Sequence, residues 1–209
     1  MLLTIDTFTG GVFDTNCFFL PDSGILVDAP QETAEWLERA GHRVKTLLLT
    51  HGHIDHSWDC ARIVREHGCR IVCHADTVDS VTVKDFFKGF GFGWEIETVQ
   101  PGDLDVIPEG PAQTLGGHLF DVLLVPGHCP GSLCFLDKEA QILFGGDVLF
   151  AGGAGRWDLP MGDGALLFRG IREKLWPLGD AVKVLPGHGP ATTIGIERRT
   201  NPFVGETAE

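Results

Sequence analysis

The stretch TLLLTHGHIDHSWD, residues 46–59, constrains the fold of this chain more than any other. An apolar, β-favouring run leads directly into His51, His53, Asp55 and His56. Residues i and i+2 of an extended segment project to one side, so His51 and His53 can bind one ion. Asp55 and His56 follow after the chain turns and can point to a second ion. Because burying these groups without a ligand would be costly, the stretch predicts a buried strand that ends in a metal site.

Further polar residues stand where other predicted strands stop. They are His128, Asp147 and His188, which bring the candidate donors to seven. Neutral imidazole and carboxylate together suit zinc or another first-row divalent metal. Seven donors are more than one tetrahedral ion can use, and a carboxylate has two oxygens with which to bridge a pair of ions. The remaining isolated histidines are interpreted as ordinary core or surface residues: His42, His67, His74 and His118.

The order of predicted elements indicates two sheets packed together. Strands are predicted over 2–8, 16–20, 25–29, 45–50, 70–74, 121–125, 132–136, 141–150 and 181–188. Helices are predicted over 31–42, 60–68, 165–176 and 192–200. Strands outnumber helices within each half, and helices must cover the second face of each sheet. We therefore expect an α+β fold, with two sheets inside and helices outside, in a single domain over 1–209.

Composition excludes several classes of partner. Hydrophobic residues make up 43 % of the chain, charged residues 22 %, and the formal net charge is −13. Such acidity argues against nucleic acid and against an acidic membrane surface. The longest apolar runs are too short to span a bilayer, and the first residues lack a signal-peptide pattern, so a cytoplasmic protein is expected. In that setting the six cysteines are expected to be reduced.

Several motifs together resemble the metallo-β-lactamase superfamily. In chain order they are THGHIDH (50–56), VPGHCPGS (125–132), FGGDVLF (144–150), GAGRWD (153–158), LPGHGP (185–190) and ERRTNPF (197–203). The last motif and GAGRWD are similar to segments of the small bacterial glyoxalase II-like, or hydroxyacylglutathione hydrolase-like, enzymes. The resemblance covers nearly the whole chain and implies the αββα metallo-β-lactamase sandwich, with two mixed β-sheets and helices on the outer faces.

The resemblance also implies a ligand set and a reaction. His51, His53 and His128 would hold a first metal; Asp55, His56 and His188 would hold a second; Asp147 would bridge them, and Asp55 and Asp147 would be the catalytic carboxylates. Two divalent ions are implied, with zinc as the first choice and iron or manganese as alternatives. A binuclear metal-dependent hydrolase would use a metal-activated hydroxide on a small-molecule thioester, S-D-lactoylglutathione or a related one.

Two alternative functions remain. The intact set of seven candidate donors argues against a non-catalytic, mainly binding role, and the second alternative is a dioxygenase. Persulfide dioxygenases share the superfamily signature but use a single iron, and resemble P-[AG]-H-D-Y where this chain has PGHGP. Gly189 therefore favours the hydrolase. Larger glyoxalase II enzymes bind glutathione with a C-terminal helical domain, which has no counterpart before Glu209. Weak glutathione binding is therefore expected.

Other departures concern single residues. Trp58 stands where small residues are usual, so it is expected to narrow access to the metals or to cover the second one. Cys129, beside His128, replaces a common threonine and is interpreted as a packing residue rather than a reactive thiol. Arg156 and Asp158 are expected to form a structural ion pair. The aromatic segment 84–94 is either core under a loop or an apolar lip beside the metals.

Overall fold

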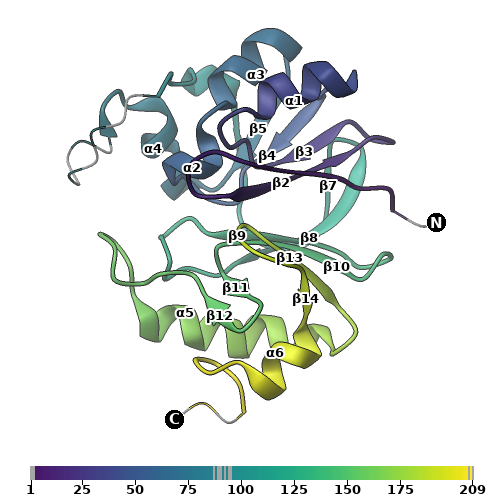
Figure 1. The fold of residues 1–209 in the computed structure, drawn as a ribbon, viewed down its shortest axis with the longest axis vertical. Coiled ribbons are helices and arrows are strands. Elements are labelled where there is room, and N and C mark those ends of the chain that lie inside the picture. Colours follow the sequence, from purple (N-terminus) through teal and green to yellow (C-terminus); the bar gives the residue numbers. More distant parts are fainter. Residues whose placement is uncertain are drawn as a thin grey trace.

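The computed structural model describes residues 3–86, 88, 91, 93, 96–206 and 208. Its architecture has four layers, which are a helical layer, two central β-sheets and a second helical layer (Figure 1). This arrangement confirms the predicted α+β sandwich. No helix among the described residues is long and apolar enough to cross a membrane.

The first sheet is built by the N-terminal half of the chain. Its strands, in spatial as well as chain order, are β1 (Asp6–Gly10), β2 (Thr15–Leu20), β3 (Ile25–Val27), β4 (Thr46–Leu48), β5 (Arg70–Cys73) and β6 (Leu104–Val106). Strands β1 to β3 pair antiparallel, whereas β3 to β6 pair parallel. The sheet is therefore mixed, and β3, β4 and β5 all end at the same edge.

The second sheet is built by the C-terminal half. Its spatial order is β14 (Thr192–Thr193), β13 (Lys183–Pro186), β10 (Ile142–Gly146), β9 (Leu133–Asp137), β8 (His118–Leu124) and β7 (Gly110–Leu115). Strands β8 and β10 are both antiparallel to β9, and β13 is parallel to β10. Hence β8, β10 and β13 run in one direction and also end at a common edge. A small hairpin, β11 (Leu149–Phe150) with β12 (Gly153–Ala154), follows β10.

Helices cover the outer face of each sheet. Helices α1 (Thr33–Ala40) and α3 (Cys60–His67) lie on the first sheet, and α5 (Gly164–Gly170) and α6 (Ile194–Thr200) on the second (Figure 1). The helix begun by α5 continues as a π-helical turn at Ile171–Leu175 and a 3₁₀ turn at Trp176–Leu178. The short elements are α2 (Ile54–Ser57), a 3₁₀ turn η1 (Ala75–Thr77), α4 (Val78–Thr82) and η3 (Pro101–Asp103).

Alternation along the strands explains how the layers hold together. In β2, Phe18 and Leu20 pack between the two sheets, whereas Cys17 and Phe19 pack under α1 and α3. The same period of two divides β9, where Phe135 faces the other sheet and its neighbours face α5. Side chains of both halves thus share one central apolar layer. The free thiols of all six cysteines are buried, as expected for packing residues.

The predicted strand over 141–150 is wrong in extent. The backbone of Gly146 has φ 48°, and a Cβ there would lie 2.5 Å from Thr50 Oγ1. The chain therefore turns out of β10 at Gly146 and resumes as β11, with Asp147 in the turn. Similarly, the strand predicted over 2–8 begins only at Asp6 and runs to Gly10. The sequence did not predict strands β6, β7 and β12 or helices α2 and α4, because they are too short or too polar for a periodic signal. The helix predicted over 192–200 begins only at Ile194, because Thr192–Thr193 pair with β13 as β14.

Candidate metal centre

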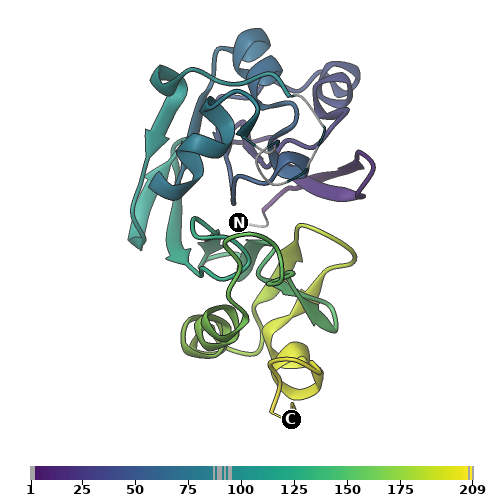
Figure 2. The ribbon, with the colours of Figure 1, turned by 90° about the vertical axis from the view of Figure 1, so that its left-hand side faces the viewer.

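The seven predicted donors lie together at the edge where the parallel strands end. This edge carries α2 and α4 in Figure 1, and Figure 2 turns it toward the viewer. Their ligand atoms form three close groups, within which all atoms lie within 4.8 Å of one another. The groups are His51 with His53 and His128; His51 with His56 and Asp147; and Asp55 with His56 and His188. The structure therefore brings together every residue that the sequence indicated.

Local backbone geometry separates the first pair of donors from the second. His53 is extended, with φ −65° and ψ 148°, and is the N-cap residue of α2. The turn of α2 then redirects the chain, and the His56 amide donates to the His53 carbonyl oxygen at 3.1 Å. His51 and His53 consequently share one group, while Asp55 and His56 share another, as the spacing predicted.

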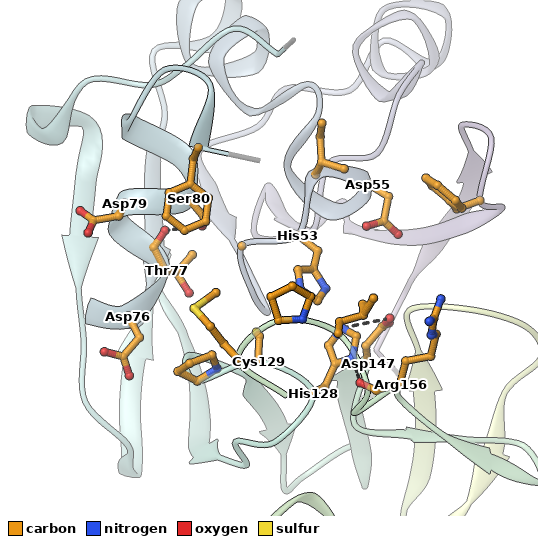
Figure 3. A pocket seen from close by; sticks show the side chains of 18 of the residues that line it. His53, Asp55, Asp76, Thr77, Asp79, Ser80, His128, Cys129, Asp147 and Arg156 are labelled. Atoms are coloured by element: carbon orange, nitrogen blue, oxygen red, sulfur yellow. Dashed lines mark hydrogen bonds and ion pairs between the residues drawn. The ribbon is translucent and has the colours of Figure 1, made fainter. Parts of the chain in front are cut away.

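Distances place Asp147 between the two outer groups. Its Oδ1 lies 3.2 Å from His56 Nε2, and its Oδ2 lies 3.6 Å from His128 Nε2 and 3.4 Å from His188 Nε2. Asp55 Oδ2 approaches His188 Nε2 at 3.2 Å. A carboxylate in this position reaches donors of both groups. Figure 3 shows Asp147 and His128 close together, facing His53 and Asp55 across the floor of the cavity.

Hydrogen bonds at the far ring nitrogens fix three imidazole tautomers. His56 Nδ1 donates to Asp28 Oδ2 at 2.8 Å, His128 Nδ1 to the Arg156 carbonyl at 2.7 Å, and His188 Nδ1 to the Phe13 carbonyl at 3.0 Å. Carboxylate and carbonyl oxygens only accept, so each Nδ1 carries the proton. Each Nε2 is therefore the ring nitrogen that faces the centre and would bind a metal, which is the arrangement of metal-ligating histidines.

His51 is oriented through a relay. The Thr50 hydroxyl donates to Asp28 Oδ2 at 2.8 Å and lies 3.0 Å from His51 Nδ1. Because its proton is directed at Asp28, the hydroxyl accepts from His51 Nδ1, and His51 Nε2 also presents a lone pair. His51 Nε2 and His128 Nε2 are then 3.2 Å apart with no proton between them. Two such lone pairs repel unless a cation lies between them.

Two buried atoms at the centre also lack a hydrogen-bond partner. They are His56 Nε2 and Asp147 Oδ1, whose 3.2 Å separation does not have hydrogen-bond alignment. Buried polar atoms are almost always paired, so a buried nitrogen and oxygen that touch without a hydrogen bond indicate that a cation binds between them. The donor set, five imidazoles and two carboxylates, is that of a divalent transition metal. The residues present therefore fit the predicted metal.

Electrostatics divide the imidazoles into two kinds. Burial and the neighbouring histidines hold the pKa of His51 well below its usual value, and burial with His128 lowers the pKa of His53 to about 3. Burial alone would also lower the pKa of His188, but hydrogen bonds to Asp147 and Asp55 raise it to about 10. The carboxylates likewise outweigh burial to raise the pKa of His56. A cation bound here would displace protons from His56 and His188.

Asp28 is the most important residue that the sequence analysis missed. It is buried at the end of β3, with φ 60°, and also accepts the Thr50 amide at Oδ1. A single carboxylate thus orients two of the predicted ligands, His51 through Thr50 and His56 directly. The sequence did contain one indication. Asp28 is an acidic residue directly after the apolar strand ILV, with no basic residue near it in the sequence.

Replacing Asp28 with asparagine is expected to weaken metal binding about 10- to 100-fold. The amide nitrogen placed at Oδ2 would donate rather than accept, which forces His56 to carry its proton on Nε2, where the metal should bind. Competition with a chromophoric chelator measures the affinity. Asp59→Asn is the matched control, because Asp59 is also buried but its carboxylate accepts from backbone amides of α1 and contacts no predicted ligand. Equal affinities in the two variants would contradict the orienting role.

A cavity of about 740 Å³ opens above the centre. Its floor includes His53, Asp55, His128, Asp147 and His188. Cavities of this size are typical of small-molecule sites. The centre is therefore accessible to a small molecule from one side.

The surroundings of the cavity can be compared with the predictions for three other residues. Trp58 follows α2, is half-buried and does not line the cavity, so the prediction that it narrows access is wrong. Cys129 lines the wall with Sγ 3.3 Å from Ser132 Oγ, and burial raises its pKa to about 11. A thiol of that pKa stays protonated, as expected for packing. Arg156 donates to both carboxylate oxygens of Asp158, which confirms the ion pair.

The aromatic segment and the isolated histidines complete the comparison with prediction. Phe86 lines the cavity, which favours the lip interpretation for that residue. The others of the segment that were considered lie outside the described residues: Phe87, Phe90, Phe92 and Trp94. The four isolated histidines bond elsewhere, as expected: His42 to Asp6, His67 to Val44, His74 to Asp76 and His118 to Asp137.

Comparison with known proteins agrees with this site and fold. The model of the Metallo-beta-lactamase superfamily matches residues 10–188. Hydroxyacylglutathione hydrolase GloC of Haemophilus influenzae is 35% identical, over 97% of this chain and 98% of its own. The crystal structure of BLEG-1 B3 metallo-beta-lactamase is 30% identical with a TM-score of 0.87, covering 96% of this chain and 99% of its own.

A third similar protein bears on the metals. The crystal structure of TTHA1623 in a di-iron-bound form is 33% identical with a TM-score of 0.79, covering 95% of this chain and 99% of its own. Sandwich, donor cluster and cavity together define a metallo-hydrolase. The chain belongs to the metallo-beta-lactamase superfamily.

Proposed function

We propose that this protein hydrolyses a thioester of the glyoxalase II type, S-D-lactoylglutathione or a related small thioester. The observation that carries the proposal is the convergence of four oriented imidazoles and two carboxylates at the floor of an open cavity. Similarity to a hydroxyacylglutathione hydrolase along nearly the whole chain supports the choice of a thioester.

The residues would hold two divalent ions. His51, His53 and His128 would bind one ion, Asp55, His56 and His188 the other, and Asp147 both. Zinc is the first choice for this nitrogen and oxygen set, with iron or manganese as alternatives. The di-iron form of the similar TTHA1623 structure supports a binuclear site and keeps iron in consideration.

When bound, such ions supply Lewis-acid chemistry, because they lower the pKa of water and polarise a carbonyl oxygen. The chain's own residues prepare the site for it. Asp28, Thr50 and two backbone carbonyls lock the imidazoles, so the donors need no rearrangement. A thiolate leaves readily, so a thioester makes no demand for a strong protein general acid. This preference also supports a thioester over an amide.

The test compares reactions on protein loaded separately with zinc and with iron. Hydrolysis of S-D-lactoylglutathione is followed by thiol release, and oxygen consumption is followed with glutathione persulfide. We expect thioester hydrolysis with a high KM and bound metal close to two ions per chain. A β-lactam is included because a similar structure is a B3 metallo-beta-lactamase. Oxygen uptake with iron, and no thioester turnover with either metal, would establish the dioxygenase instead.

A further inference from the structure

The walls of the cavity above the metal centre are mostly apolar. They are formed by separate segments: the β1–β2 turn, α2, the residues after α4, β11 and the loop before α5. Their main apolar side chains are Phe13, Ile54, Phe86, Phe150, Leu159 and Met161. Phe13 and Met161 are 46% and 52% exposed, although large apolar side chains are normally buried. The walls therefore offer apolar surface that a bound molecule would cover.

Charged groups at the cavity are few and unevenly placed. Apart from the metal-centre residues, the charged side chains among the described lining are Asp76, Asp79 and Arg156. Figure 3 places Asp76 and Asp79, on η1 and α4, on one side of the cavity and Arg156 on the other. The guanidinium of Arg156 is already engaged by Asp158 through two hydrogen bonds of 2.9 and 3.0 Å. Outside the metal centre, Arg156 is thus the one cation among the described lining residues, and it already has an acidic partner.

Glutathione is poorly matched to these walls. It carries two carboxylates and one ammonium, so an ammonium that pairs with Asp76 or Asp79 still leaves two carboxylates, for which the lining offers only the already paired Arg156. An apolar, uncharged arm would instead bury the surface of Phe13, Phe86 and Met161. Each buried methylene strengthens binding by about four-fold.

We propose that the substrate is a thioester with an apolar acyl group and an uncharged thiol arm, rather than a glutathione thioester. The inference rests on the proposed thioesterase function for its chemistry. The observation behind it, the apolar and acidic lining of the cavity, does not depend on that chemistry. The lining determines which molecules bind, whether or not a bond in them is then cleaved. Apolar walls select the acyl group, and the carboxylates on η1 and α4 select against an anionic arm.

Two measurements separate the substrate class from the reaction. The first is equilibrium binding, by calorimetry, of two uncleavable thioethers, S-octyl-N-acetylcysteamine and S-octylglutathione. We expect the neutral thioether to bind at least ten-fold more tightly. The second is hydrolysis of acetyl, butanoyl, hexanoyl and octanoyl thioesters of N-acetylcysteamine and of glutathione. We expect kcat/KM to rise about three- to four-fold per methylene until the cavity is filled.

Variants of lining residues identify which parts of the cavity wall determine the binding preference. Phe13→Ala should weaken binding of the octyl thioether about five-fold, since it removes an apolar wall but keeps the carbonyl that His188 uses. Leu119→Ala, an exposed apolar side chain on β8, should leave it unchanged. The double change Asp76→Asn and Asp79→Asn should strengthen S-octylglutathione binding about two- to five-fold, most at low salt, whereas Asp22→Asn should not.

The outcomes distinguish the two proposals. Preferential binding of the neutral thioether without turnover of any thioester would support the substrate class and overturn the thioesterase. Turnover of S-D-lactoylglutathione above all neutral thioesters, together with equal or tighter binding of the glutathione thioether, would overturn the substrate class and keep the thioesterase.

Discussion

Asp147→Ala is expected to lower kcat/KM for the hydrolysed substrate by about a thousand-fold or more, which corresponds to about 4 kcal/mol of transition-state stabilisation. The variant removes a side chain whose two oxygens between them approach His56, His128 and His188. Bound metal should fall from about two ions per chain to one or fewer. Elemental analysis of purified protein and the hydrolysis rate, measured on the same sample, check both expectations.

A buried carboxylate elsewhere in the same sheet provides the matched control. Asp137, at the end of β9, accepts from His118 and from the Ala140 amide, away from the centre. Asp137→Ala should lower the melting temperature but keep metal content and rate. If Asp147→Ala retained two ions and its turnover, the bridging assignment would be wrong.

The clustering of the seven candidate donors could be predicted because their positions obey simple rules. Because His51 and His53 are two residues apart, their side chains project to the same side of an extended chain. Parallel strands end at one edge, so polar residues after β8, β10 and β13 must meet there. Each rule acts within one sheet, whereas the meeting of the two sets of donors also requires that the sheets pack with these edges together.

The supporting shell was not predictable in the same way. His128 and His188 are oriented by the carbonyls of Arg156 and Phe13, and a backbone carbonyl is present in every residue type. Asp28 became significant only when β3 was placed beside β4. Trp58 illustrates the opposite error, since nearness in sequence to His56 did not place its indole in the cavity. The orienting contacts join residues far apart in the sequence, and the residue types involved do not indicate such contacts. They could therefore not be predicted before the strands were placed.

Close packing around the donors leads to the second large effect, at Gly187. A Cβ at this position would lie 2.2 Å from Asp147 Oδ1 and 2.5 Å from His56 Cε1. Real Cβ atoms do not approach so closely, and both neighbours are buried, so Gly187→Ala must displace at least one predicted ligand. A misplacement of about 1 Å at a reacting centre costs about 100-fold in rate, and we expect kcat/KM to fall by that amount. Chelator competition should show weaker metal binding than in the parent protein.

Gly102→Ala is the control for Gly187→Ala. It shows whether replacing a glycine by alanine lowers metal binding and activity even where no ligand is displaced. A Cβ at Gly102, in η3, would meet nothing within 4 Å, and its backbone conformation does not require glycine. That variant should keep full metal content and activity, while Gly187→Ala loses both yet retains its circular dichroism. Because Gly187 itself offers no ligand atom, a rate within a few-fold of the parent would show that the donors can shift freely. Such freedom would contradict the close-packed, pre-oriented centre on which the proposed function depends.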